Sequence, residues 1–283
     1  MRWKGLRQSE NVEDRRGMSG RKIAFGGGIG TIVIVLIVLF LGGDPGQILN
    51  LAVEDNQVQA PGEILKDDTM AQFIAVVLAE TEDTWNRIFS ESGRAYRAPK
   101  LVLYSGQVQS ACGFNSAATG PFYCPGDEKV YIDLSFCEEL KTRFGAPGDF
   151  AIAYVVAHEV GHHVQKLLGT LDEVNGLRNR MDEKEFNRYL VRLELQADYY
   201  SGIWAHDADQ WKGILEPGDA EEAISAAGAV GDDRLQKQAQ GYIVPDAFTH
   251  GTSEQRMRWF KKGYDSGNPA AFDPFEVRSE DAL

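Results

Sequence analysis

The stretch FAIAYVVAHEVGHHVQKLL, Phe150–Leu168, is almost wholly apolar except for a group of ionisable residues in its middle. Such a run predicts a long, buried helix. Within it, His158, Glu159 and His162 form the pattern H-E-x-x-H. Residues four apart share one face of a helix, so both histidines can bind one metal ion, and neutral imidazole suits Zn²⁺. Glu159 would lie beside the ion, where it can take a proton from an activated water.

A catalytic zinc ion usually has three protein ligands and one open position. The position six residues after the second histidine of the motif is Leu168, which excludes the metzincin arrangement. The next helical stretch, Glu183–Asp207, carries Glu194 and Asp198 on one face. Glu194 would bind the ion, and Asp198 would accept the free N–H of a ligand histidine. The reverse assignment, with Asp198 as the ligand, stays open. The small Ala197 would let the two helices approach closely.

The rest of the chain predicts shorter elements around these helices. They are a helix at Thr69–Ser90, strands at Lys100–Val108 and Lys129–Leu134, and amphipathic helices at residues 219–240 and 252–264. Two strands around a long turn predict an antiparallel hairpin, whose edge around Lys100–Gln109 would hold an extended peptide. The expected fold class is mainly α with a small antiparallel β-hairpin or sheet.

Charge is distributed unevenly along the 283 residues, whose net charge is −13. This balance leaves no broad basic face, which excludes nucleic acid as an expected partner. Residues 1–22 are nevertheless basic, and Ile23–Leu41 contains no charge. A helix of that length measures about 28 Å, enough to cross a membrane. We therefore expect a membrane anchor at residues 23–43, a cytoplasmic tail at 1–22 and an exported remainder. The alternative is a cleaved signal peptide, but no cleavage site follows the apolar run.

The exported part divides into a linker at residues 44–68, a main domain at 69–268 and a tail at 269–283. Cys112 and Cys124 flank a stretch that contains Gly, Asn and Pro and reads as a turn between strands. A disulfide between them would hold that turn, as is common in exported proteins. Cys137, in the apolar context DLSFCEEL, is expected to be a buried thiol.

These motifs together carry a family resemblance. HEVGHH, followed 32 residues after His162 by ELQAD, resembles the gluzincin pattern H-E-x-x-H…E-x-x-A-D. The basic tail, the apolar segment and the stretches CGFNSAATGPFYCPGDEKVYIDLSF and FTHGTSEQRMRWF resemble a family of bacterial neutral zinc metallopeptidases. The resemblance implies a zincin-like domain and one zinc ion per chain. It also implies that the ligands are His158, His162 and Glu194, that Glu159 is the catalytic carboxylate and that Asp198 supports a ligand. Cys137 stands where relatives are expected to have an aromatic residue, which favours a structural role.

One further segment, His250–Arg256, has the H-x₅-R spacing of the H-P-x-x-x-x-R segment in membrane-anchored gluzincins. That similarity places His250 and Arg256 near the site, where they could polarise the scissile carbonyl or hold the oxyanion. Gly251 replaces the proline here. The alternative is that His250 caps the last helix and Arg256 pairs with a surface carboxylate.

The expected function is a membrane-anchored, zinc-dependent peptidase that hydrolyses peptide bonds with Glu159 as the general base. Its partners would be a peptide or protein substrate and the membrane. The alternative from another class is a non-catalytic, zinc-stabilised envelope protein that binds a membrane partner. Zinc retention with or without peptide turnover separates the two. The sequence does not predict an oligomeric state.

Overall fold

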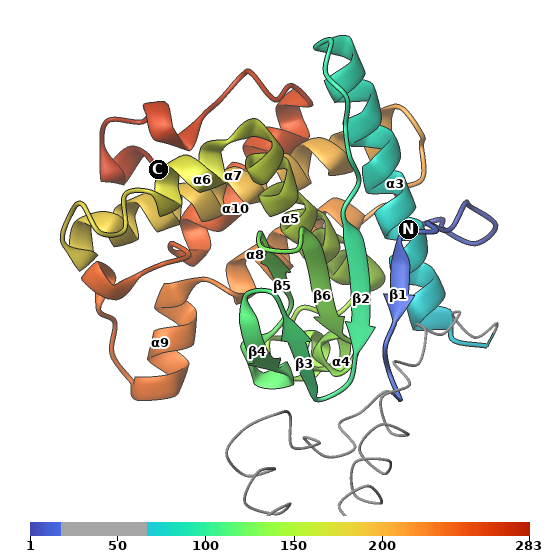
Figure 1. The fold of residues 1–283 in the computed structure, drawn as a ribbon, viewed down its shortest axis with the longest axis horizontal. Helices are drawn as coiled ribbons and strands as arrows, with labels where there is room; N and C mark the ends of the chain where they lie inside the picture. The colour runs from blue at the N-terminus through green and yellow to red at the C-terminus, as the bar shows by residue number, and fades with distance from the viewer. Residues whose placement is uncertain (18–66) are drawn as a thin grey trace, which may run out of the picture.

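The computed structural model describes residues 1–17 and 67–283, in which a small sheet packs against a body of helices (Figure 1). The strands are β1 (Val12–Asp14), β2 (Lys100–Tyr104), β3 (Gln107–Ser110), β4 (Gly113–Ser116), β5 (Phe122–Cys124) and β6 (Lys129–Asp133). The α-helices are α3 (Thr69–Glu91), α4 (Ser135–Thr142), α5 (Asp149–Leu168), α6 (Thr170–Asn175), α7 (Glu183–Gln210), α8 (Asp219–Ala229), α9 (Asp232–Gln240) and α10 (Ser253–Ser266). A mainly helical fold with a small sheet agrees with the expected α+β class.

The four-stranded sheet has the order β1-β2-β6-β5, with β1–β2 and β2–β6 parallel and β5–β6 antiparallel. The expected antiparallel pairing of Lys100–Val108 with Lys129–Leu134 is therefore wrong. The segment between these strands is long enough to form the β3–β4 hairpin and then β5, so the chain returns to β2 in the parallel direction. The expected edge around Lys100–Gln109 is also wrong, because β2 lies between β1 and β6. Among the described strands, the free edge next to β6 is β5.

Residues 1–17 belong to the same folded unit as the sheet. In β1, Val12 pairs with Leu101 of β2. Arg7 donates to Glu82 of α3 at 2.9 Å. The buried amino group of Met1 lies 2.9 Å from the carboxylate of Asp149, at the start of α5. Arg7, Arg15 and Arg16 of this segment thus form ion pairs within the domain.

This placement corrects the expected localisation, in which residues 1–22 and the catalytic domain lie on opposite sides of a membrane. β1 is hydrogen-bonded into the sheet of the domain, so residues 1–17 and the domain lie together. None of the helices within residues 1–17 and 67–283 is long and apolar enough to cross a membrane. The anchor expected at residues 23–43 lies outside the described residues, as does nearly all of the expected linker.

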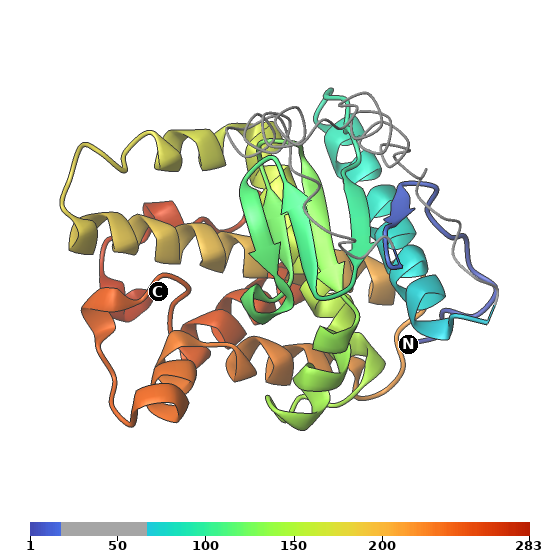
Figure 2. The same cartoon turned by 60° about the horizontal axis from the view of Figure 1, so that its bottom comes forward.

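The helical body is built around α5, α7 and α10, which lie beside one another behind the sheet (Figures 1 and 2). A Cβ atom on Gly161 would lie only 3.0 Å from the carbonyl oxygen of Ala197, so the close approach of α5 and α7 requires glycine there. The expected helix at residues 219–240 is interrupted at Val230 and Gly231 and forms α8 and α9 instead. After this interruption, Leu235 of α9 borders the cavity described below.

Candidate functional site

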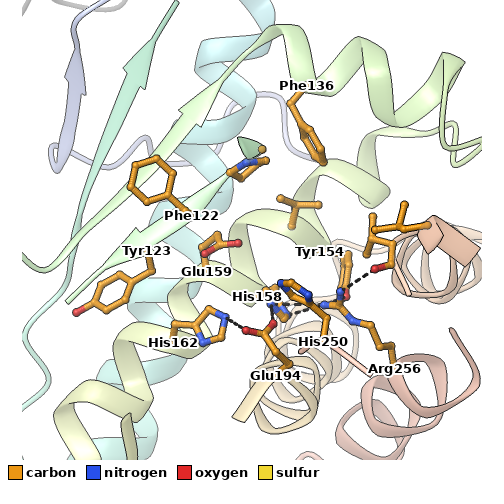
Figure 3. Close-up of a pocket in the computed structure, with 15 residues that line it drawn as sticks. Phe122, Tyr123, Phe136, Tyr154, His158, Glu159, His162, Glu194, His250 and Arg256 are labelled. Carbon is orange, nitrogen blue, oxygen red and sulfur yellow. Dashed lines mark hydrogen bonds and ion pairs between the residues drawn. The ribbon is translucent and has the colours of Figure 1, made fainter. Parts of the chain in front are cut away.

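Three side chains from α5 and α7 converge in the way a metal ion requires (Figure 3). His158 and His162 lie one turn apart on α5, and Glu194 faces them from α7. Nε2 of His158 lies 3.1 Å from one carboxylate oxygen of Glu194, and Nε2 of His162 lies 3.4 Å from the other. One ligand atom from each of the three residues lies within 4.8 Å of the other two.

The other ring nitrogen of each histidine is already held. Nδ1 of His158 lies 2.8 Å from Asp198, and Nδ1 of His162 lies 2.9 Å from the side-chain oxygen of Gln165. Such contacts fix the tautomer and the direction of a ligand histidine, and they leave both Nε2 atoms facing Glu194. Two imidazoles and one carboxylate are a fitting donor set for zinc with a position left for substrate. The arrangement supports Glu194 as the ligand and Asp198 as the residue that orients His158.

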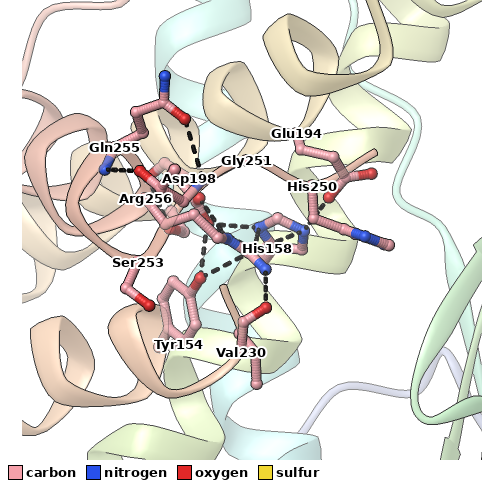
Figure 4. A network of polar contacts seen from close by, with 12 residues as sticks. Tyr154, His158, Glu194, Asp198, Val230, His250, Gly251, Ser253, Gln255 and Arg256 are labelled. Carbon is pink, nitrogen blue, oxygen red and sulfur yellow. Dashed lines mark hydrogen bonds and ion pairs between the residues drawn. The ribbon is translucent and has the colours of Figure 1, made fainter. Parts of the chain in front are cut away.

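Asp198 is the centre of a buried polar network (Figure 4). Its carboxylate accepts hydrogen bonds from Tyr154 at 2.5 Å, from His158, and from Arg256 at 2.8 and 3.0 Å. Asp198 is fully buried and Arg256 is 4% exposed. The guanidinium of Arg256 therefore lies behind His158 and neutralises Asp198. Arg256 thus pairs with a buried carboxylate of the site and not with the surface carboxylate of the expected alternative, and this pairing disfavours a direct role in holding the oxyanion.

The charges of the site alter the affinity of its groups for protons. Burial lowers the pKa of His158, but the charge of Asp198 and its hydrogen bond outweigh burial and raise that pKa to about 9. Burial raises the pKa of Glu194, but His162, His250 and His158 lower it well below its ordinary value. Without an ion, protonated histidine stabilises these carboxylates. A divalent cation would replace those protons, so its binding releases protons.

The candidate metal ligands and Glu159 line one cavity of about 370 Å³. Glu159 is 8% exposed and follows His158 directly on α5, so its carboxylate is close to the ligand group without belonging to it. It forms no hydrogen bond or ion pair within the described parts of the chain. β5, one of the two edge strands of the four-stranded sheet, also borders the cavity, with Phe122 and Tyr123 in its lining.

Two contacts hold β5 in this position. The hydroxyl group of Tyr123 lies 3.0 Å from Nδ1 of His163, a buried residue of α5. Cys124 forms a disulfide with Cys112, in the turn between β3 and β4. Cys137 is a buried thiol on α4, and burial raises its pKa to about 12. The sheet edge beside the site is thus tied both to the metal-binding helix and to the neighbouring hairpin.

His250 reaches the cavity from the loop before α10, and a carboxylate orients it. Nδ1 of His250 lies 3.2 Å from Asp232, whose other oxygen accepts the backbone N–H groups of Thr249, His250 and Gly251 at 2.7, 2.6 and 3.2 Å. Gly251 has a φ of 88°, which proline cannot adopt, and proline has no N–H for Asp232. The conformation of this loop therefore accommodates glycine at position 251 and excludes proline. Sequence reasoning missed Asp232 because it lies in a different helix.

The chain belongs to the family described as "Putative neutral zinc metallopeptidase", which it matches over residues 1–275. It is similar to the Escherichia coli K12 protein named "Uncharacterized protein YpfJ", with 48% identity over 97% of this chain and 99% of that protein. It is also similar to "Uncharacterized protein Rv2575" of Mycobacterium tuberculosis H37Rv, with 40% identity over 84% of this chain and 85% of that protein. No solved structure matches the chain. The match confirms the family resemblance and supports zinc as the metal.

Proposed function

We propose that the protein is a zinc-dependent peptidase whose active site is the cavity between α5, α7 and β5. The observation that carries the proposal is the convergence of His158, His162 and Glu194 on one point, with Glu159 beside them on the same cavity. A buried set of ionisable side chains that opens to a cavity is typical of an active site.

Zinc bound by these three residues would supply a Lewis acid that polarises the scissile carbonyl and lowers the pKa of water. Glu159 takes the proton of the attacking water and passes it to the leaving amine. His250, held by Asp232, donates to the charge that develops on the carbonyl oxygen. Asp198 keeps His158 in the tautomer that directs Nε2 toward the ligand position.

The free edge of β5 supplies a place for the substrate. An extended peptide can add to an exposed strand through backbone hydrogen bonds, and β5 borders the cavity that contains Glu159. Peptide recognition through the backbone would make the site a peptidase rather than a hydrolase of small esters or phosphates.

The test is the Glu159→Gln variant of the full chain, with zinc content and peptide hydrolysis measured together. Glutamine keeps the size of the side chain but cannot accept the proton. We expect full zinc occupancy and normal folding, with kcat lower by at least about 10²-fold. Hydrolysis at the wild-type rate would contradict the mechanism. Zinc binding by a wild-type protein that hydrolyses no peptide would favour the non-catalytic, zinc-stabilised protein instead.

A further inference from the structure

The cavity has an apolar recess beside Glu159. Four of its lining residues are half-buried apolar side chains that pack on the main core with one side and face the cavity with the other. They are Phe136 of α4, Val155 of α5, Val230 at the end of α8, and Leu235 of α9. Figure 3 shows Phe136 pointing toward the cavity from the side opposite Glu194. Apolar surface held open next to a metal site marks a place that a ligand covers.

The recess lies close to the position of the reacting bond. Val155 precedes Glu159 by four residues on α5, so the two share one face of the helix, about 6 Å apart along its axis. An extended peptide advances about 3.3 Å per residue. The recess is therefore within about two residues of the bond on which Glu159 acts.

The charged side chains that line the cavity all have either an ionic partner or a role in the proposed mechanism. The ionisable residues that line it, tyrosines aside, are the three metal ligands, Glu159, His250 and Arg256. Arg256 is paired with Asp198, and His250 with Asp232. Apart from Glu159, which the proposed mechanism uses for proton transfer, no unpaired charge of the described residues lines the cavity. An acidic substrate side chain in the recess would lose its water without gaining a partner, which is unfavourable in an apolar site. A basic side chain could pair only with Glu159, which would occupy the proton acceptor.

We infer that this recess receives an apolar side chain of the substrate, so that the protein selects peptides with a branched aliphatic or aromatic residue next to the scissile bond. The inference rests on the proposed function in one respect, namely that a peptide occupies the cavity. It adds to that function the class of substrate and the residues that select it. Leu235 and Phe136 determine the preference, and neither contributes to metal binding or proton transfer.

The experiment measures peptide binding separately from hydrolysis. Fluorescence polarisation follows the binding of labelled Gly/Ser host peptides, each with one Leu, Ala or Glu at its centre, to the zinc-loaded, full-length Glu159→Gln protein. We expect the Leu peptide to bind at least about 10-fold more tightly than the Ala peptide, and the Glu peptide more weakly than either. Mass spectrometry of peptide mixtures cleaved by the wild-type protein should show Leu or Phe beside the cut bond.

A charge reversal of the recess supplies the specific test. In Leu235→Lys the preference for Leu should fall at least about 10-fold, and the Glu peptide should bind more tightly than in the wild type. Leu168→Lys is the matched control, because Leu168 is 39% exposed and lies outside the cavity. Circular dichroism and zinc content should be unchanged in both variants.

The outcomes separate the two proposals. Hydrolysis by the wild type without a preference at the cut bond, together with equal binding of the three peptides, would overturn the recess and leave the peptidase function standing. A clear preference for Leu in binding, without hydrolysis by the wild type, would support the recess and overturn the peptidase function. Binding of none of the peptides and no hydrolysis would overturn both.

Discussion

The molecule holds two networks of ion pairs, one near each edge of its four-stranded sheet. On the site side, near β5, α5 and α7 hold the candidate metal ligands and the buried pair Asp198–Arg256. On the N-terminal side, residues 1–17 form ion pairs with α3 and β6, among them Arg7–Glu82 and Glu13–Lys129. The N-terminal charges pair with one another and hold the edge strand β1. The site network opens to a cavity and leaves Glu159 without a partner among the described residues. Similar chemistry thus serves stability on one side and reactivity on the other.

The largest effect is expected from Asp198→Ala on the site side. This variant leaves the guanidinium of Arg256 buried without a carboxylate, which should lower the free energy of unfolding by about 3–5 kcal/mol. Urea unfolding of the zinc-loaded and zinc-free proteins measures it. Zinc affinity should also fall about 10- to 100-fold, because Nδ1 of His158 loses its partner. In the double variant Asp198→Ala/Arg256→Met, stability should recover in part. Simple addition of the two single losses would show that the pair does not act as a unit.

The next largest effect is expected at His250, which belongs to the network that opens to the cavity. His250→Ala should keep zinc, and kcat should fall about 10²–10³-fold with little change in KM, if His250 donates to the oxyanion. Asp232→Asn retains an oxygen for the backbone N–H groups but removes the charge that orients His250. Its kcat should fall by less, again with KM unchanged. The N-cap of α10 is Thr252, which forms a capping box with Gln255, so the expected helix-cap role of His250 is wrong. Unchanged activity together with a lower thermal stability would make His250 only a structural residue of the loop before α10.

The third prediction concerns the disulfide that ties the edge strand β5 to the turn between β3 and β4. Alkylation under denaturing conditions should label one cysteine before reduction and three afterwards. The Cys137→Ala protein is the control, and it should label none and then two. Replacement of Cys112 and Cys124 by serine opens a loop with a sequence separation of 12, which should lower stability by about 3 kcal/mol. Three labelled thiols before reduction would contradict the bridge.

The smallest effect is expected from the ion pairs of Glu13 on the N-terminal side. Burial raises the pKa of Glu13, but the ion pairs with Lys129, Arg15 and Lys100 outweigh burial and lower it to about 2. The resulting stability is present above the unfolded-state pKa of 4.5 and is lost as the pH falls through about 2. The shift corresponds to about 3 kcal/mol at most, and solvent screening reduces the expected loss in Glu13→Gln to about 2 kcal/mol at pH 7.

Thermal unfolding of the wild type and of Glu13→Gln at several pH values provides the measurement, and their difference should shrink between pH 4.5 and pH 2. Glu10→Gln is the control on the same segment, since Glu10 is exposed, and it should change stability by less than about 0.5 kcal/mol. A difference that is independent of pH would mean that Glu13 has no ionic role in the sheet.

The site was more predictable from the sequence than the sheet, for a physical reason. The relation between His158 and His162 is local, because residues that are four positions apart on a helix share one face. Glu194 and Asp198 repeat that spacing on the next long helix. Arg7 and Glu82 are 75 residues apart, Glu13 and Lys129 are 116 residues apart, and no periodicity reveals these pairs. The contact between Asp232 and His250 was not predicted for the same reason. The direction of β2 relative to β6 depends on the path of the intervening chain.

The parallel pairing of β1 with β2 also bears on the order of events during synthesis. Val12 pairs with Leu101, which follows it by 89 residues. At the usual rate of translation, Leu101 is made about 4–18 s after Val12. Through that interval no other strand of the described residues has been made. The charged and polar character of β1, within the sequence SENVEDRR at residues 9–16, would help to protect an unpaired strand from association with other chains. The strand at the start of the chain can thus join the sheet only after a much later segment has been made.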